Sequence, residues 1–183
     1  MEMKFVNLRC ILLFVIVISV TNCISEKRKI KMKLKKWYNK EILFSDDIKI
    51  SSLDSVSIDD NFFTAKYKIL TYIDTAGCTE CKLKLYEWKL FKEEIAALDL
   101  DVSFLFIAWQ KDYDILEELR YKNDFLYPFL YDAKGSMELL NKFSDIREYG
   151  TFLLDSCNRI KLIGSPITND KLRRLYLEWM AEL

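Results

Sequence analysis

The sequence contains no histidine among its 183 residues, and only four glycines and two prolines. The absence of histidine excludes Ser-His and Cys-His catalysis, histidine-ligated zinc or copper, and proton transfer through imidazole. The scarcity of glycine and proline argues against a disordered or low-complexity chain. Basic and acidic residues balance, with 28 of each. The whole chain therefore gives no case for nucleic-acid binding.

Hydrophobic side chains are abundant, and they supply enough apolar surface for a full core. They make up 51% of the residues, and aromatic residues alone make up 14%. The length suits one domain once an N-terminal targeting segment is set aside.

The N-terminus has the pattern of a secretory signal. Lys4 and Arg9 precede an apolar run from Ile11 to Val20, and this run is shorter than the ~20 residues of a transmembrane helix. Val20-Thr21-Asn22-Cys23 resembles a bacterial lipobox, in which Cys23 would carry the lipid, although Asn22 replaces the usual small residue. Simple cleavage and an uncleaved anchor remain alternatives.

A strongly basic stretch follows this signal. We expect residues 1–23 to be the signal, residues 24–36 a solvated tether near anionic lipid headgroups, and residues 37–183 the domain. This predicts a domain tethered to a membrane of the cell envelope and facing the periplasm. Basic residues beside an apolar segment prefer the cytoplasmic side, so a cytoplasmic orientation stays open.

Hydrophobic periodicity predicts alternating strands and helices in the domain. Strands are expected at 66–73, 102–109, 128–132, 151–155 and 159–163, with one or two short strands between 42 and 50. Helices are expected at 83–98, 112–121, 135–143 and 169–180. This order predicts an α/β fold, with a central mixed sheet and helices on both faces.

The helix periodicity also predicts which side chains face the sheet. These are Leu85, Trp88, Phe91, Ile95 and Leu98 in the first helix, Ile115, Leu116 and Leu119 in the second, and Leu172, Leu175, Tyr176 and Trp179 in the last.

Cys78 and Cys81 form a CxxC motif between a predicted strand and a predicted helix. That arrangement is typical of a thioredoxin-like redox site. The positive end of the helix favours a thiolate on Cys78, which would be the nucleophile. Cys81 would then close a disulfide and release a bound partner. A zinc site needs about four ligands, which one CxxC without histidine does not supply.

Three segments carry a resemblance to a known family: Ile69–Ile73 before the CxxC motif, Tyr127–Asp132, and Gly150–Asp155. On these segments, residues from about 37 to 183 resemble the thioredoxin-like envelope thiol-disulfide oxidoreductases of the TlpA/ResA and redoxin type. The resemblance implies a thioredoxin-like fold and a redox-active Cys78–Cys81 disulfide. It also implies protein thiol or disulfide substrates, a membrane or soluble thiol as electron donor, and no metal or organic cofactor.

The sequence departs from this family at several positions. Gly77 replaces the usual tryptophan before the first cysteine, and Gly150 replaces the cis-proline that precedes Thr151. Glycine does not supply a rigid cis bond, so the substrate groove is expected to differ more than the fold. Glu80 places negative charge near Cys78 and disfavours its thiolate, which predicts a reductant. Asp74 is a candidate for proton transfer to Cys81, or a solubilising residue at a strand end.

Other functions stay open. The Cys78–Cys81 disulfide could be a structural clip in a non-catalytic binding module on the same scaffold. A thiol peroxidase is a weaker alternative, because its threonine and arginine pattern is missing around Cys78. Tyr72 is a weaker candidate than Asp74 for proton transfer to Cys81 and is expected in the core. Cys157 is expected to be an exposed free thiol in a turn, with a role in mixed disulfides as the minor alternative.

Overall fold

The computed structural model describes residues 26–50, 63–74, 83–110, 113–125 and 127–182. The chain divides into two units, Met1–Trp37 and Tyr38–Leu183. In the first unit, residues 26–37 are helical. Among the described residues, no helix has both the length and the apolarity that crossing a bilayer requires.

The second unit is built on a six-stranded sheet with the order β1-β4-β3-β2-β5-β6. β2 runs parallel to β3, and β3 runs parallel to β4, whereas β1, β5 and β6 pair antiparallel with their neighbours. The strands are β1 (Lys49–Ile50), β2 (Tyr67–Ile73), β3 (Val102–Ala108), β4 (Phe129–Tyr131), β5 (Thr151–Leu154) and β6 (Ile160–Ile163).

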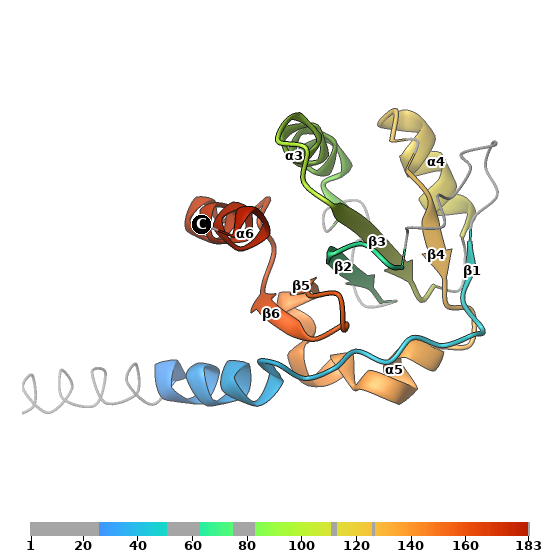
Figure 1. Ribbon diagram of the computed structural model, residues 1–183. Coiled ribbons are helices and arrows are strands. Elements are labelled where there is room, and N and C mark those ends of the chain that lie inside the picture. Colours follow the sequence, from blue (N-terminus) through green and yellow to red (C-terminus); the bar gives the residue numbers. More distant parts are fainter. Residues whose placement is uncertain (1–25, 51–62, 75–82, 111–112, 126, 183) are drawn as a thin grey trace, which may run out of the picture. The chain divides into compact units, whose positions relative to one another are not determined.

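Helices cover both faces of this sheet (Figure 1). α3, α4 and α6 pack on one face, and α5 with the 3-10 helix η2 covers the other. The predicted fold class, a mixed sheet flanked by helices on both faces, is therefore confirmed. The helices are α3 (Leu85–Ala97), α4 (Asp114–Lys122), α5 (Ser136–Asn141), η2 (Phe143–Tyr149) and α6 (Asp170–Ala181).

An aromatic cluster fills the space between the sheet and α3. The ring of Trp88 lies edge-on to Phe106, with 5.4 Å between ring centroids, and Phe106 lies edge-on to Phe129 at 5.6 Å. Edge-to-face pairs of this kind add about 0.5–1.5 kcal/mol to the gain from burial alone. Because α3, β3 and β4 share this cluster, α3 is packed firmly against these two strands.

The helix faces differ from the sequence prediction at four positions. Leu98 is 52% exposed because it follows the last residue of α3, and Ile115 is 51% exposed. In α6, Leu175 and Trp179 are 42% and 37% exposed, whereas Tyr176 and Met180 are buried. In each case the apolar residues extend beyond the part of the helix surface that the sheet covers.

The helix predicted over 135–143 was also wrong in its extent. α5 ends at Asn141 because Lys142 adopts a left-handed conformation, with φ of 64°. η2 then begins at Phe143 and runs to Tyr149, an element that the sequence pattern did not predict. The turn at Lys142 lets Phe143 pack against Phe152 of β5 on the α5 face, with 5.5 Å between ring centroids.

The chain from residue 39 to residue 50 joins the two edges of the sheet. The backbone N–H of Asn39 donates to the carbonyl of Ile160 in β6 at 2.8 Å, and β1 pairs with β4 at the opposite edge. Between these points, the buried side chain of Asn141 accepts from the N–H of Leu43 at 2.9 Å and donates to its carbonyl at 2.8 Å. The side chain of Asn141 thus bonds both backbone groups of Leu43, as a neighbouring strand would.

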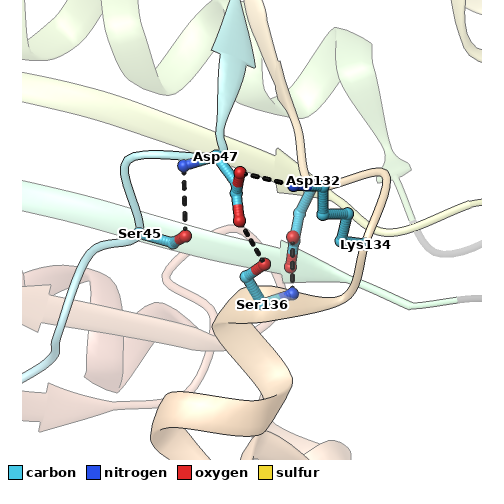
Figure 2. Close-up of polar contacts among 5 residues, drawn as sticks. All are labelled: Ser45, Asp47, Asp132, Lys134 and Ser136. Atoms are coloured by element: carbon cyan, nitrogen blue, oxygen red, sulfur yellow. Dashed lines mark hydrogen bonds and ion pairs between the residues drawn. The ribbon is translucent and has the colours of Figure 1, made fainter.

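A polar cluster holds the start of α5 (Figure 2). The buried carboxylate of Asp132 accepts from the N–H groups of Ser136 and Met137 at 2.7 and 2.9 Å. Asp47 forms an ion pair with Lys134 at 2.7 Å, and this pair lowers the pKa of Asp47. Asp132 therefore satisfies helix N–H groups that would otherwise lack partners.

Lys68 is a buried cation in the middle of this apolar sheet. Its side chain has no exposed surface, and its ammonium donates to the carbonyls of Ala65 at 3.1 Å and Ser156 at 3.4 Å. Burial lowers the pKa of Lys68, and Asp155 only partly offsets this. Because the folded protein holds this proton less tightly than the unfolded chain, stability is expected to rise as the pH increases towards the usual pKa of lysine.

Lys68→Met should flatten that rise. Lys66 provides a matched control of opposite sign, because its pairing with Glu182 raises the pKa of Lys66. The contribution of the Lys66–Glu182 pair to stability is lost as the pH increases. Lys66→Met removes this loss, so the free energy of unfolding should rise more steeply with pH than in the wild type. Urea unfolding between pH 7.5 and 11.5 measures both, because the Lys66 contribution is lost only as the pH passes the usual pKa of lysine. A Lys68→Met profile that parallels the wild type would contradict the assignment.

Candidate functional site

The predicted redox motif lies outside the described residues. This holds for Cys78, Glu80 and Cys81, and for the lipidation candidate Cys23. The described residues closest to the motif along the chain are Asp74, directly after β2, and Leu83, two residues before α3. The predicted roles of the cysteines and of Glu80 stay predictions, and the site is built from the residues around them.

A cavity of about 860 Å³ lies at the carboxyl end of β2. Asp74 and Leu83 both line it. Its other walls come from the start of β5, from the loop between β6 and α6, and from α6 itself. The chain therefore enters and leaves the predicted motif at residues that share one cavity. Ligand sites of α/β proteins are usually found at the carboxyl ends of the strands.

Antiparallel pairing brings the start of β5 beside the end of β2. Thr71 pairs with Thr151, and the N–H of Tyr72 donates to the carbonyl of Gly150 at 2.8 Å. The hydroxyls of Thr71 and Thr151 lie 3.4 Å apart, and Thr151 is buried. Gly150 and Thr151, predicted to modulate the site, thus line the same cavity as Asp74.

Gly150 does not reproduce the geometry of the proline that it replaces. The described residues contain no cis peptide bond. Gly150 has φ of 15° and ψ of −6°, which are not the extended angles of β5. Gly150 still pairs with the sheet, because its carbonyl accepts the hydrogen bond from the N–H of Tyr72. Its backbone role is therefore pairing with β2.

Gly164 and Tyr176 fix the opposite wall of the cavity. The N–H of Gly164 donates to the carbonyl of Thr151 at 2.8 Å, and the buried hydroxyl of Tyr176 donates to the carbonyl of Gly164 at 2.9 Å. Gly164 has φ of 110°, and a Cβ there would lie 3.0 Å from Leu172. Only glycine takes this conformation without strain, and the wall depends on it.

Tyr72, the weaker candidate for proton transfer, also lines the cavity. Its ring packs on Phe143 with 4.5 Å between centroids, as expected for a core residue. Its hydroxyl, however, is buried and has no hydrogen-bond partner among the described residues, and burial raises the pKa of Tyr72. A buried unpaired hydroxyl is destabilising by about 1–3 kcal/mol. Alternation along β2 could have placed Tyr72 on the α5 face, but the missing partner has no sequence signal.

The cavity combines an apolar interior with charged groups of both signs. Trp88, Phe152 and Leu172 contribute apolar walls, and Asp74 and Lys171 contribute charges of opposite sign. Such a surface suits a neutral or mixed-charge polypeptide better than a polyanion. Within the part of the chain that the structure describes, no three carboxylate or thiol side chains gather as a metal ion would require.

Cys157 lies in the turn between β5 and β6, at the opposite end of β5 from Thr151. Its thiol is free and exposed, as the sequence predicts. Because β5 separates this turn from the cavity, Cys157 is not part of the site. The structure thus brings together Asp74, Gly150 and Thr151 and excludes Cys157.

Two Tyr→Phe variants test which tyrosine hydroxyls at the cavity form hydrogen bonds in the folded protein. Tyr72→Phe removes a hydroxyl that bonds to no described residue, so the free energy of unfolding should stay constant or rise by up to about 2 kcal/mol. Tyr176→Phe removes a donor and leaves the Gly164 carbonyl unpaired, so it should lower stability by about 1–3 kcal/mol. Urea unfolding of both variants measures this. An equal loss in the two variants would show that Tyr72 has a partner in the folded protein.

Comparison with known proteins finds similarity in structure alone. No protein-family model and no curated protein sequence matches this chain. The thioredoxin domain of a thiol-disulfide oxidoreductase from Bacteroides vulgatus is 13% identical and covers 75% of this chain and 96% of its own, with a TM-score of 0.49. StoA from Bacillus subtilis is 16% identical and covers 62% and 84%, with a TM-score of 0.43.

A secreted disulfide oxidoreductase from Mycobacterium tuberculosis, described as homologous to DsbE of E. coli, is 14% identical. It covers 55% of this chain and 70% of its own, with a TM-score of 0.40. At these identities the likeness concerns the fold, and the fold itself is defined by the strand order and directions given above. The fold of this chain is thus defined by its own mixed six-stranded sheet, in the order β1-β4-β3-β2-β5-β6, with helices on both faces.

Proposed function

We propose that this protein is a membrane-tethered thiol-disulfide oxidoreductase of the cell envelope, in which Cys78 and Cys81 cycle between dithiol and disulfide. One observation carries the proposal: the residues on either side of the motif, Asp74 and Leu83, line one cavity. Cys81 is two residues from Leu83, and Cys78 is four residues from Asp74. Chain geometry limits their Cα separations to about 7 and 14 Å, and the proposal therefore puts both cysteines near the cavity.

The reaction follows thiol-disulfide exchange. The Cys78 thiolate attacks one sulfur of a substrate disulfide, the substrate S–S bond breaks, and the released sulfur leaves as a thiolate that takes up a proton. The Cys81 thiolate then attacks the Cys78 sulfur of the mixed disulfide and releases the second substrate thiol. Two electrons and two protons pass to the substrate. A thiol donor, membrane-bound or soluble, reduces the Cys78–Cys81 disulfide again.

The substrate is a disulfide within a polypeptide. The apolar interior of the cavity and its mixed charges fit side chains that flank such a disulfide. Negative charge from Glu80 destabilises the Cys78 thiolate and so favours the oxidised pair, which makes the dithiol a better electron donor. The proposed direction is therefore reduction of the substrate.

Redox titration of the full chain in detergent tests this proposal. Serine at Cys10, Cys23 and Cys157 leaves only the motif pair, and alkylation then counts free thiols in glutathione and dithiothreitol buffers. We expect reversible two-electron exchange near the thioredoxin value of about −270 mV. A pair that resists reduction, or never closes, would contradict the proposal and favour a binding module with the disulfide as a structural clip.

Glu80→Gln tests the direction of electron flow. Removing this charge should lower the pKa of Cys78 and shift the reduction potential to a less negative value, because the thiolate becomes more stable. Glu87→Gln, in the first turn of α3, is the matched control and should change the potential less. Thiolate absorbance against pH gives the pKa, and equal effects of the two variants would remove the assigned role of Glu80.

A further inference from the structure

The helix of residues 26–37 carries an unusual concentration of positive charge. Seven of its residues are lysine or arginine, and Glu26 is its one acidic residue. Glu26 pairs with Lys29 at 3.1 Å, and both side chains are two-thirds exposed, so the pair neutralises little of the charge. The exposed basic residues are Lys27, Arg28, Lys29, Lys31, Lys35 and Lys36, and Lys33 is half-buried.

The charge of the chain is divided between its two units. Residues 1–37 contain nine basic and two acidic residues, whereas residues 38–183 contain 19 basic and 26 acidic residues. The zero net charge of the whole chain therefore hides a basic N-terminal unit and an acidic domain. An anionic surface would attract the first and repel the second.

The covalent position of the helix limits its partners. Glu26 is six residues beyond Val20, the end of the apolar run, and an extended chain of that length spans at most about 22 Å. When the apolar run or a lipid on Cys23 is held in a bilayer, the helix begins close to the headgroup layer. A tethered helix meets headgroups at high effective concentration, so even a moderate affinity keeps it bound.

We propose that this basic helix lies on the anionic lipid headgroups of the membrane to which the chain is tethered. Each lysine or arginine near such a surface contributes about 1 kcal/mol. Ile30, 40% exposed, and Leu34, one turn later, add a small apolar strip beside the charges. Because each is already partly covered, their gain is smaller than that of the basic side chains, and the attachment is mainly electrostatic. The proposal rests on the proposed membrane tether and is independent of the redox chemistry.

Trypsin protection of the full chain in vesicles tests the proposal, because trypsin cleaves after lysine and arginine. One set of vesicles is pure phosphatidylcholine, and the other contains 30% phosphatidylglycerol. Cleavage after Lys27–Lys31 is followed by mass spectrometry and normalised to cleavage after Lys171, an exposed residue of the domain. We expect at least about tenfold slower cleavage on the anionic vesicles, and loss of that protection in 1 M salt.

A variant pair separates the helix from general charge effects. Gln at Lys33, Lys35 and Lys36 should remove most of the protection at Lys27–Lys31, whereas Gln at the exposed domain residues Lys122, Lys134 and Lys142 should leave it unchanged. Three other results would overturn the proposal. Equal cleavage on both vesicles means that the helix does not bind headgroups. Equal protection on neutral vesicles means that the acidic domain covers it. Stronger protection by single-stranded RNA on neutral vesicles assigns it to nucleic acid.

Discussion

The pairing of β2 with β5 is the constraint on which the rest of the site depends. β2 is bonded to β3 along seven residues and to β5 along four, so its carboxyl end cannot move without disturbing both neighbours. The hydrogen bond from Tyr72 to Gly150 ends this ladder at the cavity. The wall formed by Gly164 is then fixed in turn, because its N–H is bonded to Thr151. The aromatic cluster beneath α3 packs this helix on β3, the other neighbour of β2.

Much of the fold could be predicted because its sheet is buried on both faces. Continuous apolar runs such as 102–109 identify central strands, and the three-and-four spacing of Leu85, Trp88, Phe91 and Ile95 identifies α3, with all four buried. The errors arose where the hydrophobic pattern of the sequence differs from the packing of the side chains. Ile115 and Leu175 belong to apolar stripes that the sheet does not reach. η2 was missed because a 3-10 segment after a left-handed Lys142 has no helical period.

The chemistry of the candidate site stays a prediction from the CxxC spacing, and its surroundings could be predicted only in part. The CxxC spacing indicates the reaction, and the Gly150–Asp155 segment indicates which strand faces the motif. The orphan hydroxyl of Tyr72 and the brace from Tyr176 to Gly164 depend on tertiary contacts between residues distant in sequence. No local pattern encodes such contacts. Lys68 is a similar case. A lysine within a predicted strand is expected to face solvent, but the side chain of Lys68 is buried.

The central claim is that the Cys78–Cys81 pair acts at the cavity between β2, β5 and α6. Amide chemical shifts of the fully reduced and fully oxidised protein test this claim most directly. The account predicts the largest changes at Thr151, Gly150 and Gly164, and little change at Ser136 and Met137, whose amides are bonded to Asp132 away from the cavity. Changes confined to the turn at Cys157, or no change at Thr151 and Gly150, would contradict it.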